Sequence, residues 1–344
     1  MKATKSLNST KRLASRLLVA ACVLGSALSA AQTLQPFYGI LTQPLNLPAP
    51  EIAMARPSEL SMSYIMKAYY QMVSSGGALS LAIPYDLPMR KLIEILPLLN
   101  GIVIPDGLDS VVKGKEYSTK VAFIINWAKE RNDDGFFFSV IAAGKGFREL
   151  MNASAGKDEI VQDCSQPNWE VHSALNIDWV QFKSTNLLKE LQQSEVEHAL
   201  TNPNSVALSH NCSIPVAKFK SSSLDKEFHL VASGTTNEGD LNFVALVEHK
   251  KYPFVGMQFA PESSAYAISK GHAKDRRTIR LYRDLVSLFL LSDPTTLTFR
   301  VDDLPMAAMN LVMNKDIPVH GLLDQDQIYL YRRWASGRDI DMPN

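Results

Sequence analysis

The residues Val140-Ile141-Ala142-Ala143-Gly144-Lys145-Gly146-Phe147-Arg148-Glu149-Leu150 form an apolar run, a turn of small residues and the start of a helix pattern. A strand that passes directly into a helix through such a turn has the architecture of a nucleophile elbow. In that arrangement a Ser or Cys side chain stands at the helix N-terminus, where backbone N–H groups favour negative charge. We therefore expect a functional site here, beyond the carboxyl end of a buried strand.

The chain on the N-terminal side of this turn alternates short apolar runs with helical spacing. All-apolar runs are typical of strands that are buried on both faces, and their alternation with helices predicts a parallel sheet. Pro84 and Pro105 close two of the runs, and Gly76-Gly77 stops one helix. The sequence thus predicts an α/β fold with a mostly parallel central sheet flanked by helices on both faces. We expect strands at 37–42, 79–83, 101–104 and 136–141, and helices at 63–74, 88–99 and 118–131.

The chain on the C-terminal side is less regular, because Ser, Asn and charged residues interrupt the segment from about 150 to 250. Apolar runs at 228–231, 241–247 and 254–259 predict three more strands. Asn237-Glu238-Gly239-Asp240 separates the first two and predicts a hairpin turn. Apolar residues then recur at three- and four-residue steps, which predicts a helix over about 275–291.

The composition is that of a globular chain. Of the 344 residues 46% are hydrophobic and 20% are charged, which allows a sizeable core and argues against a disordered chain. The 35 basic residues equal the 35 acidic residues in number. The chain therefore lacks the basic excess of a general nucleic-acid binder, and we expect no nucleic-acid partner.

Residues 1–31 have the pattern of a targeting segment. Five basic residues precede the apolar run 17–24, and no acidic residue occurs before Glu51. The run is too short to cross a bilayer, and Ser29-Ala30-Ala31 matches the small-residue pattern of a signal-peptidase site. We expect a secretory signal peptide and a secreted, lysosomal or vacuolar protein, with a mitochondrial presequence as the alternative. No later segment has 18 uninterrupted apolar residues, so we expect no membrane span in the mature chain.

Cleavage after Ala31 would change both the charge and the cysteine content. Because five basic residues and no acidic ones are lost, 30 basic residues remain against 35 acidic ones, a formal charge of −5. Two of the three cysteines remain, Cys164 and Cys212, and they could form one disulfide in an oxidising compartment. Two N-glycosylation sequons also remain, at Asn152 and Asn211, which is compatible with a glycoprotein.

Four segments spread over about residues 36–291 together match one family pattern. They are Gly39-Ile40-Leu41-Thr42-Gln43-Pro44, Asn100-Gly101-Ile102-Val103-Ile104-Pro105, Asn126-Trp127-Ala128-Lys129-Glu130 and the loop from Tyr252 to Glu262. In order and spacing they resemble the opening strand, the third strand, the helix before the elbow and the histidine-containing loop of the gamma-glutamyl hydrolases. The resemblance implies a class I glutamine-amidotransferase-like fold and cleavage of gamma-glutamyl bonds by a cysteine nucleophile.

The chain departs from that family at the two positions that carry the chemistry. Gly144 stands where the family has its cysteine, and Ala260 stands where the family has its histidine base, while the orienting Glu262 is retained. Acyl transfer through a thiol needs a thiolate and a nearby imidazole, and neither glycine nor alanine provides one. Glycine also adopts the positive φ of an elbow without steric cost, so the fold can persist without the catalysis.

A further departure lies in the loop that stabilises the oxyanion in the family. Pro105-Asp106-Gly107 replaces Pro-Gly-Gly, and we expect the carboxylate to oppose a developing oxyanion. The resemblance implies that His210, Gly107 and Lys145 contact the substrate. Cys212 lies two residues from His210, so a relocated Cys–His pair is an alternative source of a nucleophile.

The remaining histidines show no metal-ligand spacing, and Gly144-Lys145-Gly146 lacks the spacing of a phosphate-binding loop, so we expect neither a metal nor a cofactor. Three arginines, Arg276, Arg280 and Arg283, share one face of the last predicted helix. That face would attract an acidic polyglutamate chain, or it is the solvated side of an amphipathic helix.

We expect residues 32–291 to form the hydrolase-like domain and residues 292–344 to form a C-terminal extension, which packs on the domain or meets a protein partner. The leading hypothesis is a non-catalytic relative of the gamma-glutamyl hydrolases that still binds folate polyglutamates. The alternatives are an active hydrolase with a rearranged site and an interaction protein on the same scaffold. A homodimer is compatible with all three hypotheses.

Overall fold

The computed structural model describes residues 36–45, 62–107, 115–155, 170–171, 174–202, 206, 208–209, 212–235, 241–266, 275–291, 318–319 and 328–332. The chain divides into two units, Met1–Gln35 and Pro36–Asn344, and all of these residues lie in the second. The expected signal segment 1–31, Cys164, His210, the sequon asparagine Asn211 and the turn 237–240 lie outside the described residues.

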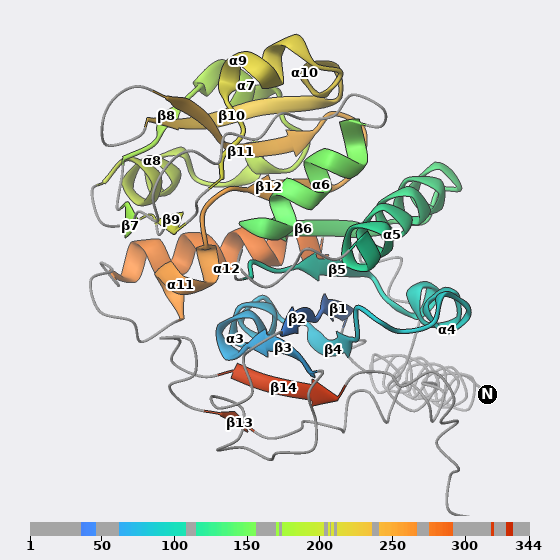
Figure 1. Cartoon of the computed structure of the whole chain (residues 1–344). Helices are drawn as coiled ribbons and strands as arrows, with labels where there is room; N and C mark the ends of the chain where they lie inside the picture. The colour runs from blue at the N-terminus through green and yellow to red at the C-terminus, as the bar shows by residue number, and fades with distance from the viewer. Residues whose placement is uncertain are drawn as a thin grey trace, which may run out of the picture. The chain divides into compact units, whose positions relative to one another are not determined.

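The centre of the second unit is an eight-stranded sheet with the order β4-β1-β5-β6-β12-β11-β10-β8 (Figure 1). The pairs from β4 to β12 are parallel, and the pairs from β12 to β8 are antiparallel. The parallel half therefore lies next to an antiparallel ribbon within one sheet. The strands are β1 (Phe37–Leu41), β4 (Leu79–Ile83), β5 (Gly101–Ile104), β6 (Ser139–Ala143), β8 (Asn176–Ile177), β10 (Phe228–Thr235), β11 (Asn242–His249) and β12 (Phe254–Met257).

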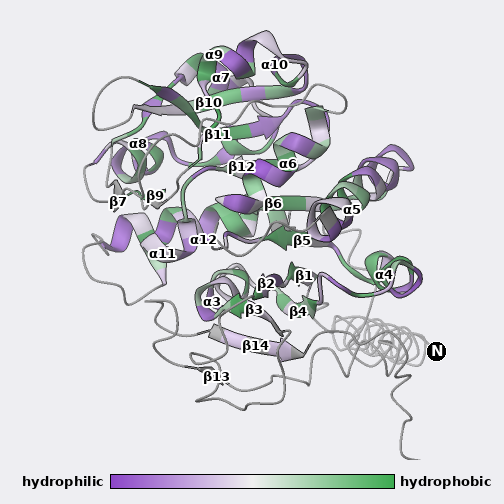
Figure 2. Ribbon diagram, in the orientation of Figure 1, coloured by the Kyte–Doolittle hydropathy of each residue, from purple (hydrophilic) through white to green (hydrophobic). Residues whose placement is uncertain are grey.

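Helices bury both faces of this sheet. Successive residues of a strand point to opposite faces, and in β1 Tyr38 and Ile40 join the apolar cluster under α3, α8 and α12, whereas Phe37 and Leu41 join the cluster under α4, α5 and α6. β5 accordingly has the colour of hydrophobic residues in Figure 2, while α5 is mixed. The predicted α/β fold with a mostly parallel, doubly covered sheet is confirmed. The helices are α3 (Lys67–Ser75), α4 (Met89–Ile95), α5 (Lys115–Asp133), α6 (Lys145–Ala155), α7 (Trp179–Ser184), α8 (Gln193–Thr201), α9 (Val216–Ser221), α10 (Leu224–Glu227), α11 (Pro261–Ala265) and α12 (Arg276–Leu291).

The helix predicted over 63–74 is wrong in its first part. Residues Met62–Met66 form strand β3, and only Lys67–Ser75 is helical. β3 is the third strand of a second sheet with the order β13-β14-β3-β2, whose other members are β13 (Pro318–Val319), β14 (Ile328–Arg332) and β2 (Gln43–Leu45). β14 pairs with β3 along its whole length. Pairing with a strand from the far end of the chain has decided the conformation, and helical spacing could not reveal that partner.

Two further element ends differ from the expectation. The strand predicted at 136–141 begins at Ser139, because the side chain of Asn132 accepts from Phe138 N at 3.2 Å and donates to Phe138 O at 2.8 Å. The helix predicted over 88–99 ends at Ile95 and continues as a 3₁₀ turn over Leu96–Leu98, where Pro97 lacks the N–H that an α-helix needs.

None of the helices within the described ranges combines the length and the apolar character that a membrane crossing requires.

Candidate functional site

The turn between β6 and α6 has the geometry of a nucleophile elbow. Gly144 lies between the strand and the helix with φ +51°, a conformation that L side chains rarely adopt. Its N–H donates to Met257 O of β12 at 2.8 Å, and its carbonyl accepts from Arg148 N at 3.2 Å in the first turn of α6. The elbow is therefore held by the neighbouring strand and by its own helix.

The elbow has no room for a side chain at Gly144. A Cβ built there would lie 2.6 Å from Oδ2 of Asp106 and closer still to Cγ and Oδ1 of the same residue. Asp106 thus occupies the space in which a nucleophile would begin. A side chain at position 144 would therefore be strained by the backbone conformation and would overlap the Asp106 carboxylate unless that side chain moved.

The carboxylate of Asp106 takes the backbone donors of the elbow for itself. Its Oδ1 accepts from Lys145 N at 2.7 Å and from Gly107 N at 2.8 Å. In a nucleophile elbow, the N–H after the nucleophile and an N–H from a neighbouring loop make the oxyanion hole. The sequence predicted that Asp106 would oppose a developing oxyanion; in the structure its carboxylate accepts from both N–H groups that would form such a hole.

Tyr69 of α3 connects Asp106 to Glu262, the first-turn acid of α11. Its hydroxyl accepts from Asp106 N at 2.7 Å, and it also hydrogen-bonds with Glu262. Glu262 is 1% exposed. Burial and the charge of Asp106 together raise the pKa of Glu262 to about 8, and the hydrogen bond with Tyr69 only partly offsets them. Glu262 is therefore mostly protonated at neutral pH.

The resemblance described above places Ala260 at the expected position of an imidazole base. It is the residue before α11 and is 9% exposed, and its methyl group offers no proton acceptor. The site thus combines an elbow with no side chain, a methyl group at the base position and two carboxyl groups. The elbow position of this arrangement provides no thiol, and Ala260 provides no imidazole to accept a thiol proton.

Two of the three expected substrate contacts meet at the elbow. Gly107 and Lys145 direct their N–H groups at the same oxygen of Asp106, whereas His210 lies outside the described residues. Lys145 is 6% exposed, and its Nζ lies 5.7 Å from the centre of the Tyr117 ring. Its side chain is thus buried beneath the elbow.

Tyr69 and Tyr117 were not predicted from the sequence as site residues, and Gln43 was predicted only as part of a strand motif. The amide nitrogen of Gln43 donates to Pro105 O at 2.7 Å and to the Tyr117 hydroxyl at 2.6 Å, which fixes the loop before Asp106. A Cβ on Gly107 would lie 2.7 Å from Gln43 Oε1, so this glycine is needed for close approach. No local pattern marks these residues, because their partners come from other elements.

Cys212, the alternative nucleophile, is disulfide-bonded, and its partner lies outside the described residues. Its carbonyl accepts from Gln258 Nε2 at 3.4 Å, so this segment lies against the loop that follows β12. A sulfur in a disulfide has no thiolate to offer as a nucleophile.

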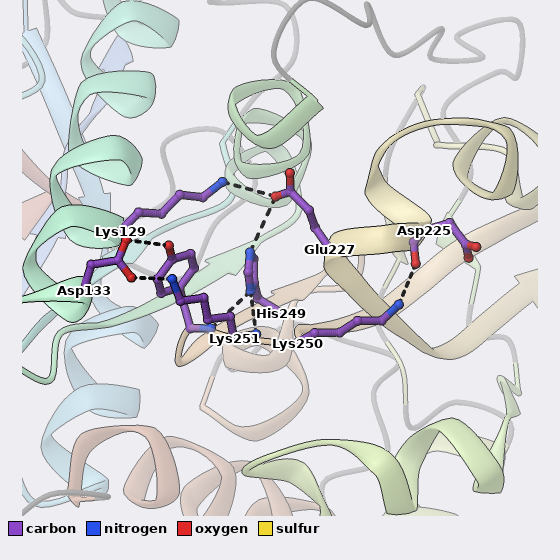
Figure 3. A network of polar contacts seen from close by, with 8 residues as sticks. Lys129, Asp133, Asp225, Glu227, His249, Lys250 and Lys251 are labelled. Carbon is purple, nitrogen blue, oxygen red and sulfur yellow. Dashed lines mark hydrogen bonds and ion pairs between the residues drawn. The ribbon is translucent and has the colours of Figure 1, made fainter. Parts of the chain in front are cut away.

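A separate polar network surrounds His249 at the end of β11 (Figure 3). Its Nδ1 accepts from Lys251 N at 2.9 Å and from Tyr252 N at 3.1 Å, and its Nε2 lies 3.5 Å from Glu227 Oε2. Burial, followed by the charges of three lysines, lowers the pKa of His249 to about 3. A histidine that stays neutral and accepts two backbone N–H groups is a structural element of the β11–β12 turn.

The arginine face of α12 is largely paired with acids. Arg280 lies 3.7 Å from Glu195 and 3.5 Å from Asp284, and Arg283 lies 2.7 Å from Asp284. These pairs reduce the positive field that an acidic ligand would meet. Within the described ranges no group of three or more His, Cys, Asp or Glu residues is placed to hold a metal ion.

The chain is similar in sequence to gamma-glutamyl hydrolases, although no protein-family model matches it. It is 23% identical to gamma-glutamyl hydrolase B of Dictyostelium discoideum over 303 residues, which cover 86% of this chain and 83% of that protein. Gamma-glutamyl hydrolase 1 of Arabidopsis thaliana is 26% identical over 232 residues, 67% of this chain and 64% of that protein. The human gamma-glutamyl hydrolase is 27% identical over 206 residues, 59% and 62% of the two chains.

These similarities confirm the resemblance expected from the sequence, and the chain spans slightly less than two thirds of the plant and human relatives. Two solved structures are also similar. One is a Thermoplasma acidophilum protein described as a candidate component of GMP synthase, with a TM-score of 0.42, 14% identity and coverage of 74% of this chain and 95% of that chain. The other is PurLQS from Thermotoga maritima, with a TM-score of 0.44, 14% identity and coverage of 73% and 99%.

Proposed function

Starting from the similarity to gamma-glutamyl hydrolases, we propose that this chain is a non-catalytic homologue of those enzymes that keeps the scaffold and has lost acyl transfer. One observation carries the proposal: Gly144 provides no nucleophile at the elbow, and Asp106 leaves no space for one. Ala260 removes the base as well. A reaction that proceeds through a thiolate has no starting group in this site.

The proposal includes a retained ligand, which is a gamma-glutamyl chain such as that of a folate polyglutamate. The support is the similarity to relatives that are named as gamma-glutamyl hydrolases. The ligand would bind without its carbonyl in the oxyanion hole, because Asp106 takes both N–H donors there.

The test is an incubation of the mature chain with a pteroyl polyglutamate, followed by chromatography of the products and by a binding measurement. We expect no shortened chains and saturable binding. The proposal would be overturned if shortened chains formed at a rate proportional to the protein concentration. That rate would also have to persist in the presence of an inhibitor of contaminating thiol hydrolases. Absence of both turnover and binding would favour the interaction protein.

Variants that restore the two missing groups test separately how Asp106 affects the elbow. The double variant Gly144→Cys with Ala260→His supplies a thiol and an imidazole, but the new Cβ would overlap the Asp106 carboxylate. We therefore expect the double variant to stay inert. The triple variant that adds Asp106→Gly removes the overlap and frees both N–H donors, so we expect it to acquire a thiol that alkylates rapidly at neutral pH.

The rearranged hydrolase has less support, because the disulfide at Cys212 removes the thiol that it would use. If the thiol were nonetheless the nucleophile in a reduced form, reduction of the protein would start turnover and Cys212→Ala would abolish it. We expect neither effect.

We also propose that residues 1–31 direct the chain into the secretory pathway, towards secretion or a lysosome or vacuole. The basic start, the short apolar run and the small residues before position 32 support this. Expression of the full chain with a C-terminal tag in secretory cells tests it. We expect a tagged product that begins near residue 32 and shifts in mass on glycosidase treatment, and a mitochondrial location of the tag would contradict the proposal.

A further inference from the structure

Among the residues that the structure describes, Asp106 binds backbone donors differently from an aspartate that caps its own helix. Asp178 accepts from Val180 N and Gln181 N, both at 3.0 Å, in the helix that it precedes. Asp106 instead accepts from its own neighbour Gly107 and from Lys145, which is 39 residues away at the start of another helix. The two donors therefore belong to different elements and converge on one oxygen.

Such convergent donors make a site for an anion. α6 begins at Lys145 and has 11 residues, so the positive end of its dipole points at the same oxygen. The N–H of Gly107 comes from the loop after β5, which Gln43 fixes through Pro105 O. Donors that a rigid scaffold holds in place bind an oxyanion without reorganisation.

A second carboxyl group, that of Glu262, lies near the same site, because the Tyr69 hydroxyl hydrogen-bonds with it and with Asp106 N. Glu262 is 1% exposed, and its Oε2 has no hydrogen-bond partner among the described residues. The charge of Asp106 opposes its ionisation. Of these two carboxyl groups, only that of Asp106 accepts from the two backbone donors.

We propose that the elbow of this chain is an oxyanion-binding site for carboxylates, and that the Asp106 side chain occupies it permanently. The inference rests on the proposed function and deepens it, because an occupied hole excludes the acyl oxygen of any substrate. An external carboxylate enters only where the Asp106 carboxylate is absent. Asp106 is half-buried, so a small anion can reach the site once the side chain is shortened.

The variant Asp106→Ala tests the proposal with formate as the probe. We expect its thermal midpoint to fall by roughly 5 °C and to recover saturably as sodium formate replaces sodium chloride at constant ionic strength. The wild-type chain should show no saturable response. Asp106→Asn keeps an oxygen in the hole, so it should lose stability without gaining a response to formate.

Asp178→Ala is the matched control, because it also deprives two backbone N–H groups of a carboxylate but at an open helix end. We expect it to lose stability without saturable recovery in formate. An equal response of Asp178→Ala, an equal response of the wild type, or no response of a folded Asp106→Ala would overturn the proposal.

If Asp106→Ala does not fold in chloride, its refolding yield is compared in formate and in chloride. The proposal requires a higher yield in formate, and equal failure in both salts contradicts it. These outcomes are separate from those of the proposed function, which is contradicted by product formation from the unmodified chain. If folded Asp106→Ala shows no response to formate, only the proposal that Asp106 occupies an oxyanion-binding site is contradicted.

Discussion

At the scale of single residues, two features define the site. Gly144 has no side chain, and the Asp106 carboxylate accepts from the two neighbouring backbone N–H groups. Loss of a nucleophile alone would leave a vacant elbow with two unused donors. Here a carboxylate satisfies both donors and fills the space of the missing side chain. Asp106 therefore stabilises the turn at Gly144, the position at which the proposed function places the lost nucleophile.

Glycine at position 144 avoids both a strained left-handed conformation and overlap with Asp106, and replacement by alanine measures the two costs together. We expect Gly144→Ala to cost roughly 3 kcal/mol or more, of which about 1–2 kcal/mol is the cost of a left-handed conformation and the rest is overlap with Asp106 and loss of its hydrogen bonds. Gly77→Ala is the control, because Gly77 has φ +94° but open space around its Cβ position. Urea unfolding of both variants measures the difference, and equal costs would contradict the steric role of Asp106.

Glu262 gives the protein a pH-dependent stability. Its pKa is raised to about 8 in the folded protein from 4.5, so its contribution is fully present below pH 4.5 and is lost as the pH rises through 8. We expect Glu262→Gln to remove this decline, so that the variant gains on the wild type between pH 5 and 8. The free energy of unfolding against pH tests this; parallel curves would show that Glu262 is ionised when folded.

At the scale of elements, the network around His249 joins α5, α10 and β11 to the turn that leads into β12. Lys129 of α5 lies 3.2 Å from Glu227 of α10, which in turn approaches the imidazole. Lys251 of the turn lies 2.6 Å from Asp133 of α5. The turn before β12 is thereby held on the same face of the sheet as the elbow helix α6.

We expect His249 to make the folded protein sensitive to acid. Its pKa is lowered to about 3 from 6.5, so its contribution is present above pH 6.5 and is lost as the pH falls towards 3. His249→Gln should therefore cost stability at pH 7.5 and show a flatter curve between pH 6 and 4. His229→Gln is the comparison at a less buried histidine of β10, whose pKa burial also lowers, and we expect a smaller change of slope there. An unchanged slope in His249→Gln would contradict the prediction.

At the scale of the whole molecule, strand β14 (Ile328–Arg332) joins two segments that are far apart in the sequence. It pairs with β3, which passes directly into α3, the helix that carries Tyr69. The hydroxyl of Tyr331 hydrogen-bonds with that of Tyr70 of the same helix, and Tyr329 meets the Tyr70 ring edge-on. The C-terminal part of the chain therefore supports the helix on which the site depends.

Truncation of Tyr331 measures that support. Tyr331 is 7% exposed, and we expect Tyr331→Ala to cost about 3–5 kcal/mol through loss of a buried ring. Tyr331→Phe keeps the ring and should cost only about 1 kcal/mol for the hydrogen bond. Chemical denaturation of both variants checks this. A cost below about 1 kcal/mol for Tyr331→Ala would show that β14 contributes little to the folded domain.

Local patterns in the sequence were sufficient for the central sheet and for the strand–turn–helix at Gly144. An apolar run, a small-residue turn and a helix pattern are read from adjacent residues, and so are the residue types at Gly144 and Ala260. The same patterns failed at β3, where 63–66 has helical spacing but lies between β2 and β14.

Only the tertiary structure decided what fills the elbow and what supports it. Asp106 reaches Lys145 across 39 residues, and Tyr69 reaches Asp106 across 37. The sequence contains each of these residues but not their distances, because contacts between separate elements depend on the packing of the whole sheet and its helices. The sequence therefore predicted that Asp106 would repel an oxyanion, and only the structure shows that its carboxylate itself accepts from the two N–H donors.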